Sequence, residues 1–321
     1  MLERKTTKQS QIMAFLPANM RELCRSQIDF EHAQEIRVRN GKPVVYMENG
    51  AERTLLDKGM PYRADENDLR EILDYISHYS RYAYENEMRQ GFLTVEGGHR
   101  IGLSGKVIVE GGRVKNMKYI SSVNIRIAHE VRGCADDIFP YVTSERQMMH
   151  TLLIAPPGGG KTTVLRDMIR QISDGNQYVK GCTVGVVDER SEIAGMYLGR
   201  EQNHLGIRTD VLDGCMKAEG MMMLVRSMAP RVLAVDELGM EEDIHAVEYA
   251  MHCGCKMVAT VHGTSLKEVE EKPYLRKLIE EKRFERYVLL AGPSHAGRVE
   301  KIYGRDKKLL FSKQERMELC I

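Results

Sequence analysis

The stretch from His150 to Thr163 constrains this chain more than any other. Its sequence, HTLLIAPPGGGKTT, is a short apolar run, then a glycine-rich turn, then the start of a segment with helical spacing. Glycine tolerates backbone angles that let successive N–H groups point at one anion, and the first turn of a helix carries partial positive charge. An apolar strand that enters a helix through such a turn is typical of a phosphate-binding loop.

The match to the pattern G-x-x-x-x-G-K-[ST] rests on Gly160, Lys161 and Thr162, because Ala155 stands where the first glycine is expected. We expect the loop amides to hold the α- and β-phosphates, Lys161 to bridge the β- and γ-phosphates, and the Thr162 hydroxyl to bind Mg²⁺. A turn without a ligand would not need a Lys-Thr pair. The predicted cofactors are ATP and Mg²⁺, and the predicted nucleotide-binding residues are Pro157, Gly158, Gly159, Gly160, Lys161, Thr162 and Thr163.

Length, charge and cysteine content limit the number of domains, the kind of partner and the cellular compartment. The 321 residues suffice for two domains, and 47 Lys and Arg against 46 Asp and Glu give a net charge of +1, which argues against an extended nucleic-acid surface. Seven cysteines without a secretory leader favour a reducing cytosol. Cys253 and Cys255 lack a second pair at zinc-like spacing, so they are interpreted as thiols. No run reaches the ~20 apolar residues of a membrane span.

Residues 1–145 are predicted to form a smaller α+β domain. Alternating residues over 35–39 and 43–47, joined by Asn40-Gly41, predict a β-hairpin. Helical segments are expected over 65–79 and 83–90, and short antiparallel strands over 92–96, 99–104, 106–110 and 122–128. Arg126 lies on the polar face of the last strand, where a solvated arginine is the simpler interpretation. The linker is expected over 133–140.

Residues 146–321 are predicted to form an α/β domain with a mostly parallel sheet. The apolar run 183–187 is followed by Asp188, Glu189 and Glu192. Because ligands bind at the carboxyl ends of parallel strands, we expect these acids near the phosphates, although an acidic surface loop is the alternative.

Two later strands also end in chemically useful side chains. The run 231–237 ends in Asp236, which is expected to hold the hydration shell of Mg²⁺, and Glu237, which is expected to polarise the attacking water. The run 256–262 ends in Thr260 and His262, which could contact the γ-phosphate; a packing histidine is the alternative.

The segments between these strands carry two further arginines. Residues 196–215 lack periodicity and are expected to form a mobile loop that contains Arg208. Residues 216–228 are expected to be a methionine-rich helix with Arg226 near its end.

Taken together, these strings resemble the stage III sporulation protein AA family, a relative of the hexameric ATPases of type II and type IV secretion systems and of pilus motors. The resemblance covers nearly the whole chain and is carried by EIRVR (35–39), GKP (41–43), YSRYA (79–83), QGFLT (90–94), GGHRIGL (97–103), SVNIRI (122–127), the phosphate loop, VDERSE (187–192), VDE (235–237) and TVH (260–262).

The resemblance implies roles for the strand-end residues. Asp188, Glu189 and Glu192 would form an acidic box, and Thr260 with His262 a histidine box. Those motors commonly have glycine where this chain has Asp236, which leaves open whether Glu237 or an acid of 188–192 is the general base. A neighbouring subunit or the N-terminal domain supplies cations in such hexamers, so Arg126, Arg208 and Arg226 are candidates.

The resemblance also implies a fold and a function: a P-loop ATPase domain of RecA/AAA type, preceded by the smaller α+β domain. The expected activity is Mg²⁺-dependent ATP hydrolysis by a homo-hexamer that drives an envelope-spanning, secretion-like channel during endospore formation. Expected partners are membrane proteins of that channel, and the expected location is the mother-cell cytoplasm, peripheral to the membrane. The alternatives are a nucleic-acid-binding ATPase and a nucleotide-sensing scaffold with little turnover.

Overall fold

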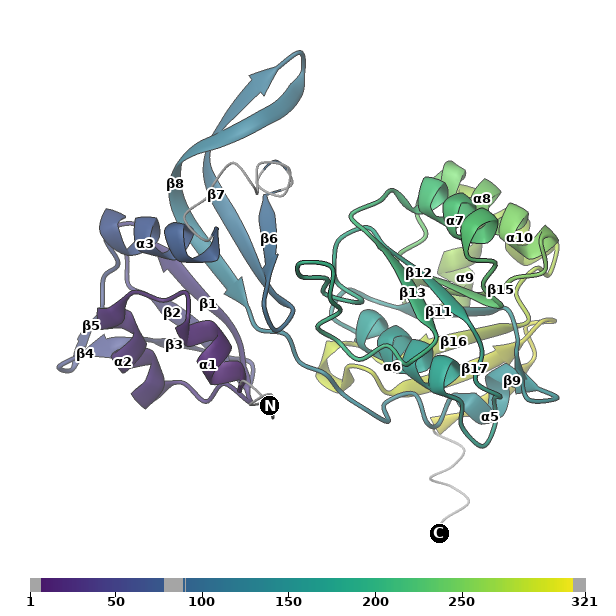
Figure 1. Ribbon diagram of the computed structural model, residues 1–321. Coiled ribbons are helices and arrows are strands. Elements are labelled where there is room, and N and C mark those ends of the chain that lie inside the picture. Colours follow the sequence, from purple (N-terminus) through teal and green to yellow (C-terminus); the bar gives the residue numbers. More distant parts are fainter. Residues whose placement is uncertain (1–6, 78–88, 90, 314–321) are drawn as a thin grey trace, which may run out of the picture. The chain divides into compact units, whose positions relative to one another are not determined.

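The chain divides into two compact units. The computed structural model describes residues 7–77, 89 and 91–313 (Figure 1). Unit 1 contains Met1–His129 and Gly195–Gln202, and unit 2 contains Glu130–Ala194 and Asn203–Ile321. The sequence places the boundary at 145/146, whereas the compact units divide at 129/130. The expected string 79–83, and the helix expected over 83–90 apart from Arg89, lie outside the described residues.

Unit 1 is built on an antiparallel sheet with the strand order β3-β2-β1-β8-β7-β6. Its elements are α1 (Lys8–Met13), α2 (Ala18–Gln27), β1 (Ala33–Arg39), β2 (Val45–Glu48), β3 (Ala51–Thr54), β4 (Leu56–Asp57), β5 (Met60–Pro61), α3 (Glu66–Ile76), β6 (Phe92–Val95), β7 (His99–Glu110) and β8 (Arg113–Arg126). The predicted hairpin is present as β1 and β2, with Ile36 opposite Tyr46. Asp65 caps α3 through a reciprocal pair of hydrogen bonds with Asp68.

Strands β7 and β8 are longer than the sequence predicts. The separate strands expected over 99–104 and 106–110 are one strand, and β8 begins at Arg113. The register of the β7–β8 pair shifts between Ser104 and Lys106. Gly105 lies at this bulge, and a Cβ there would be 2.8 Å from the Lys118 carbonyl oxygen. The two strands therefore continue past the bulge as a hairpin that extends beyond the body of unit 1 (Figure 1).

Unit 2 is built on an eight-stranded sheet with the order β13-β12-β14-β15-β11-β16-β17-β18. Six neighbouring strands, β13 to β16 in this order, are parallel, and β17 and β18 are antiparallel additions. The elements are α5 (Phe139–Val142), β9 (Thr143–Ser144), β10 (Gln147–Met148), β11 (Thr151–Ala155), α6 (Lys161–Asp174), β12 (Val184–Asp188), β13 (Thr209–Asp213), α7 (Lys217–Ser227), β14 (Val232–Val235), α8 (Glu241–His252), β15 (Lys256–His262), α9 (Leu266–Glu270), α10 (Pro273–Glu280), β16 (Arg286–Leu290), a 3₁₀ turn (Pro293–His295), β17 (Val299–Gly304) and β18 (Leu309–Ser312).

Helices cover both faces of this sheet. Helix α6 lies on one side of it, and α7, α8 and α10 lie on the other (Figure 1). Residues 151–155 and 232–235 are buried at every position. A strand covered by helices on both faces has no solvent-facing side, so its sequence is continuously apolar rather than alternating. The predicted P-loop α/β domain with a mostly parallel sheet is confirmed.

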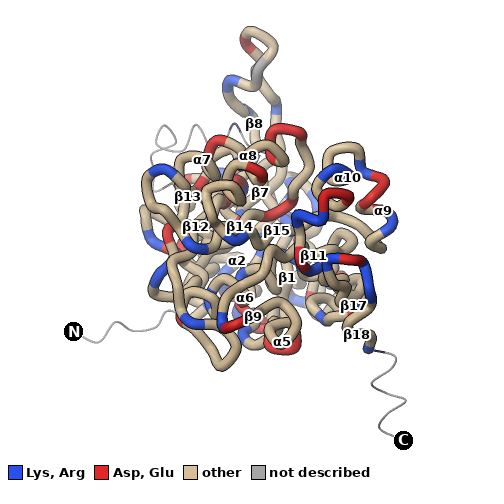
Figure 2. Tube along the Cα trace, turned by 90° about the vertical axis from the view of Figure 1, so that its right-hand side faces the viewer, with Lys and Arg blue, Asp and Glu red and all other residues tan. Residues whose placement is uncertain are grey.

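Some segments of unit 2 differ from the sequence expectation. The expected mobile loop is wrong over Thr209–Asp213, which forms β13 at the edge of the sheet. The stretch expected as a linker packs within unit 2, because Asp167 on α6 accepts a 3.0 Å hydrogen bond from the Ala135 amide. Among the described residues, no helix combines the length and apolar character needed to cross a bilayer. Basic and acidic positions are interspersed along the chain (Figure 2).

Candidate nucleotide site

The glycine-rich loop joins the end of β11 to the start of α6. Gly158 and Gly160 have φ values of 74° and 82°, a left-handed conformation that side chains disfavour. A Cβ at Gly159 would lie 2.9 Å from the Cβ of Ala155. The loop therefore needs glycine at all three positions, and it leads into the first turn of α6, whose amides have no partner within the helix. An anion placed there would meet these amides and the positive helix end.

Lys161 lies at the floor of this loop and is buried, with 7% of its surface exposed. Its ammonium donates to the carbonyls of Ala155 (3.3 Å) and Pro156 (3.5 Å) and to Nδ1 of His262 (2.8 Å). Burial lowers the pKa of Lys161, and the nearby carboxylates of Asp236 and Glu237 oppose that shift. A triphosphate would provide this ammonium with a stronger partner than a carbonyl.

Asp236, directly after β14, links three elements. The Thr162 hydroxyl donates to its Oδ2 at 2.6 Å, and the Thr260 hydroxyl donates to its Oδ1. The Glu237 amide in turn donates to the Thr260 hydroxyl at 2.9 Å. The ends of β14 and β15 and the first turn of α6 are thereby held together, because β14 and β15 are neighbours in the sheet.

Thr162 and Asp236 are the residues that could hold Mg²⁺ at this site. Among the described residues, no group of three or more His, Cys, Asp or Glu side chains could hold a metal ion by itself. Mg²⁺ prefers oxygen ligands, keeps several waters, and is usually held by one or two protein oxygens together with substrate phosphates. A hydroxyl and a carboxylate 2.6 Å apart beside the phosphate loop fit that requirement.

Glu237 is the carboxylate next to His262, the last residue of β15. Its Oε1 lies 3.2 Å from Nε2 of His262, and its Oε2 lies 3.5 Å from Nη1 of Arg190. Because the Lys161 ammonium donates to Nδ1 of His262, the ring proton belongs on Nε2, where it is donated to Glu237. Glu237 has a φ of 50°, an unfavourable conformation for a non-glycine residue. A polar chain thus runs from Lys161 through His262 to Glu237.

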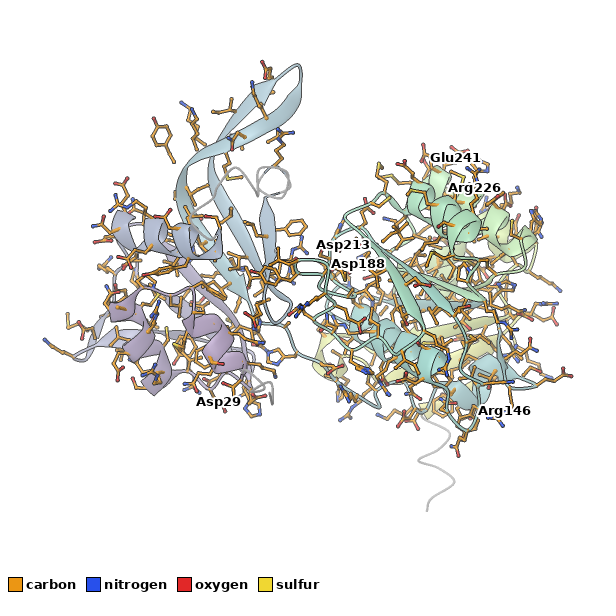
Figure 3. All side chains as sticks on the ribbon, in the orientation of Figure 1. Asp29, Arg146, Asp188, Asp213, Arg226 and Glu241 are labelled. Carbon is orange, nitrogen blue, oxygen red and sulfur yellow. The ribbon has the colours of Figure 1, made fainter. Side chains whose placement is uncertain are left out.

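The acids at the end of β12 and in the loop after it belong to a second cluster. Asp188 is 2% exposed and accepts hydrogen bonds from the amides of Glu192 (2.8 Å), Ile193 (3.0 Å) and Ala194 (2.8 Å). Burial raises the pKa of Asp188 to about 6, although the three amides oppose the shift. Asp188 is in register with Asp213 of the neighbouring strand β13, and both are labelled in Figure 3.

Side chains from helices α6 and α7 also contact the loop that follows Asp188. Glu189 forms an ion pair with Lys217 on α7. Arg166 on α6 donates to the carbonyls of Glu192 (2.7 Å) and Ile193 (2.9 Å). These contacts assign Asp188 and Glu189 an architectural part in ordering residues 188–194, while their catalytic roles and that of Glu192 stay predictions.

Two of the three candidate arginines, Arg208 and Arg226, lie in unit 2, and the third, Arg126, lies in unit 1. Arg208 donates to the carbonyl of Ser173 at the end of α6 (2.7 Å). Arg226 is exposed on α7, with its guanidinium 5.8 Å from the ring centre of Tyr249 (Figure 3). Arg126 ends β8 in unit 1, in register with Arg100. A role for any of them toward the γ-phosphate stays a prediction.

Sequence reasoning missed two features of this site. The first is Arg190, which approaches Glu237. Its place among the acids that follow the 183–187 run could have indicated a role in the site. The loop between β16 and β17, residues 291–298, lies against the phosphate loop, since the Gly297 amide donates to the carbonyl of Gly159 at 2.9 Å. No local pattern in the sequence indicates that second contact.

Residues 6–310 match the family described as "Sporulation stage III, protein AA". The chain belongs to this family. It is 42% identical over 281 residues to stage III sporulation protein AA of Bacillus subtilis (strain 168), covering 86% of this chain and 88% of the relative. The resemblance seen in the sequence is therefore confirmed.

Solved structures that are similar to this chain share its fold. The Legionella pneumophila ATPase DotB has a TM-score of 0.59 at 14% identity, covering 95% of this chain and 84% of that one. The pilus retraction motor PilT with bound ADP has a TM-score of 0.52 at 16% identity, covering 84% and 76%. At such identities the likeness shows a shared fold and nothing about activity.

Proposed function

We propose that the chain binds ATP together with Mg²⁺ on the 155–163 loop and hydrolyses it. The observation that carries the proposal is the convergence of Lys161, Thr162 and Asp236 beside a glycine loop at the start of a helix. In this arrangement the ammonium and the loop amides would bind the phosphates, and the Thr162 hydroxyl and the Asp236 carboxylate would hold Mg²⁺, which would supply positive charge next to the phosphates.

Glu237 is the residue that we assign to water activation. Its carboxylate is half-exposed and lies next to both His262 and Arg190. A carboxylate that orients or deprotonates water must reach a nucleophile near the γ-phosphate, and this one shares the site with the lysine expected to contact that phosphate. His262 contacts both Lys161 and Glu237. If a bound γ-phosphate drew the Lys161 ammonium away from His262, the contact between His262 and Glu237 would change as well.

The test is phosphate release from ATP by the purified full chain, measured with and without Mg²⁺. We expect release that requires Mg²⁺ and is unchanged by single-stranded DNA or RNA, since acidic and basic positions are interspersed along the chain (Figure 2). Strong stimulation by single-stranded nucleic acid would favour a nucleic-acid-binding ATPase. Binding of ATP without release would favour a nucleotide-sensing scaffold.

We further propose that the chain assembles as a ring, with six copies as the expected number, and that hydrolysis drives a channel used in spore formation. The support is the relationship to the Bacillus subtilis sporulation protein and the fold shared with DotB and PilT. In the proposed assembly an exposed arginine such as Arg226 acts on a neighbouring subunit. Partners would be membrane proteins of the channel, at the mother-cell face of the membrane.

Light scattering with and without a non-hydrolysable ATP analogue tests the assembly. We expect an oligomer that the nucleotide analogue stabilises. A monomer under both conditions would contradict the proposed ring. In a spore-forming bacterium, imaging of a fluorescently tagged chain tests the location; signal confined to the forespore would contradict it.

A further inference from the structure

Unit 2 contains a cavity of about 780 Å³ away from the nucleotide site. Its walls come from α5 and the residues before it, the last part of α6, the loop after α6, and β18. Its lining residues include Asp136, Asp137, Tyr141, Gln171, Tyr178 and Phe311. Gln171 is ten residues after Lys161 on α6, so this wall lies about 15 Å along the helix from the phosphate loop. The volume falls within the range of small-molecule sites.

Aromatic rings from three segments contribute to the lining. Tyr141 lies on α5, Tyr178 lies in the loop after α6, and Phe311 lies on β18. The rings of Tyr141 and Phe311 have centres 5.5 Å apart and planes inclined at 53°, and both residues are half-buried. The face of an aromatic ring carries partial negative charge and attracts a cation within about 6 Å of its centre. These rings therefore suit a ligand that combines apolar carbons with positive charge.

The charged groups of the lining are both acidic. Asp136 and Asp137 are exposed, and among the residues that the structure describes, those that line the cavity include no lysine or arginine. Arg170, which precedes Gln171 on α6, is bound elsewhere, because its Nη2 donates to Oδ1 of Asp167 at 2.6 Å. The two carboxylates would repel a phosphate and attract a cation.

A hydrogen-bond network holds the polar wall in place. The Gln171 amide donates to Oδ1 of Asp136 at 2.7 Å, and its oxygen accepts a 2.8 Å bond from Asn176. The Asn176 oxygen in turn accepts from the amides of Tyr178 (2.8 Å) and Val179 (2.9 Å), which orders the loop that carries the Tyr178 ring. A carboxylate can accept several hydrogen bonds, so Asp136 can receive one from a ligand as well.

We propose that this cavity binds an alkylammonium ion, either a free polyamine or a lysine side chain of another protein. Such an ion has N–H donors for the carboxylates and an apolar chain for the rings, so it complements both parts of the lining. A metal ion is a poorer match, because within the described part of the chain no group of three or more His, Cys, Asp or Glu side chains could hold one. Binding here would not require ATP, since the lining residues lie outside the 155–163 loop.

The test is isothermal titration of spermidine into the full chain without nucleotide, at about 0.15 M salt so that distant charges are screened. The control ligand 1,8-octanediol has the same chain length and no charge, and we expect it not to bind. Asp136→Asn combined with Asp137→Asn keeps the shape of the wall, removes its charge, and should weaken spermidine binding about tenfold. Asp57→Asn, at an exposed position of β4, should leave the affinity unchanged.

A second pair of variants tests the aromatic part of the site. Phe311→Leu removes a ring but keeps an apolar side chain, and should weaken spermidine binding about threefold, the size of an exposed cation–π contact. Phe311→Tyr keeps the ring and should bind as the wild-type chain does. If the double aspartate variant does not fold, this pair decides, and equal affinities in Phe311→Leu and Phe311→Tyr overturn the site.

A peptide of three lysines with blocked ends, titrated in the same way, separates the two sources. Tighter binding of spermidine supports a free polyamine, and tighter binding of the peptide supports a lysine of another protein. The site is overturned if neither probe binds, if the diol binds as tightly as spermidine, or if the folded double aspartate variant binds both probes as the wild-type chain does. Phosphate release from ATP by the wild-type chain is measured separately, so the proposed function can stand when this site fails.

Discussion

The Thr162 hydroxyl donates a 2.6 Å hydrogen bond to Oδ2 of Asp236, which joins the first turn of α6 to the end of β14. The two residues are far apart in the sequence, and the parallel sheet brings them together because β11 and β14 flank β15. The contact defines where Mg²⁺ would lie relative to the phosphate loop.

Removal of the Thr162 hydroxyl should raise the Mg²⁺ concentration that ATP hydrolysis requires. Thr162→Ala loses one oxygen ligand, and a lost hydrogen bond to a charged group corresponds to about 1.5–3 kcal/mol, or roughly a tenfold to hundredfold shift. Thr162→Ser keeps the hydroxyl and is the matched control. Phosphate release measured against Mg²⁺ concentration checks this, and identical curves for the two variants would contradict it.

Glu237→Gln should slow hydrolysis by about 10²- to 10⁴-fold while ATP binding persists, since an amide cannot accept a proton. Phosphate release and titration calorimetry measure the two effects separately. Glu189→Gln is the comparison, because Glu189 pairs with Lys217 rather than with His262. If Glu189→Gln or Glu192→Gln abolished turnover and Glu237→Gln did not, the base would belong to residues 188–192.

Gly160→Ala should disturb both the phosphate loop and the 291–298 loop. Its φ of 82° costs an alanine about 1–2 kcal/mol, and its Cβ would also collide with Gly297. Gly254→Ala carries a similar φ of 88° with no atom within 4 Å, so it isolates the backbone cost. Thermal unfolding should show a larger loss for Gly160→Ala. Equal losses of stability in the two variants would mean that the 291–298 loop can move away from the new Cβ at no cost in free energy.

Unit 1 should lose stability as the pH falls from 7 to 5. His99 is fully buried, its Nδ1 accepts the Ala128 amide at 3.0 Å, and burial lowers its pKa to about 4. A group with a folded pKa below its unfolded value of 6.5 contributes stability that is present above pH 6.5 and is lost as the pH falls toward 4. At pH 5 this amounts to about 2 kcal/mol.

Urea unfolding followed by circular dichroism at pH 7 and pH 5 checks the size of this loss. His99→Gln cannot titrate, so the difference between the two pH values should shrink. His245→Gln is the control, because the His245 side chain is 70% exposed. An unchanged pH difference in His99→Gln would contradict the assignment to His99.

The parallel core of unit 2 could be predicted because its signals are local. A fully buried strand is continuously apolar, and residues at the carboxyl ends of parallel strands, such as Asp236 and His262, must lie at the same edge of the sheet. The edge strand β13 was missed because its residues are only partly buried, so its sequence carries no strong apolar pattern. The sequence predicts separate strands over 99–104 and 106–110, whereas Gly105, between them, lies in a bulge within β7.

The residues of the site could be predicted better than the contacts among them. From the sequence, Asp188 and Asp236 are both acids after buried strands. Only the structure shows that Asp188 is occupied by amides of its own loop while Asp236 bonds to Thr162. The contact between Gly159 and Gly297 depends on how β16 and β11 pair, which no spacing encodes.

The central claim is that a triphosphate binds on the loop before α6. Titration calorimetry of Mg·ATP into the wild-type chain and into Lys161→Ala tests it most directly. The account predicts one site per wild-type chain and an affinity lower by roughly ten- to a hundredfold in Lys161→Ala, the value of a charge-assisted hydrogen bond. Equal affinities in two folded proteins, or no binding to the wild-type chain, would contradict it.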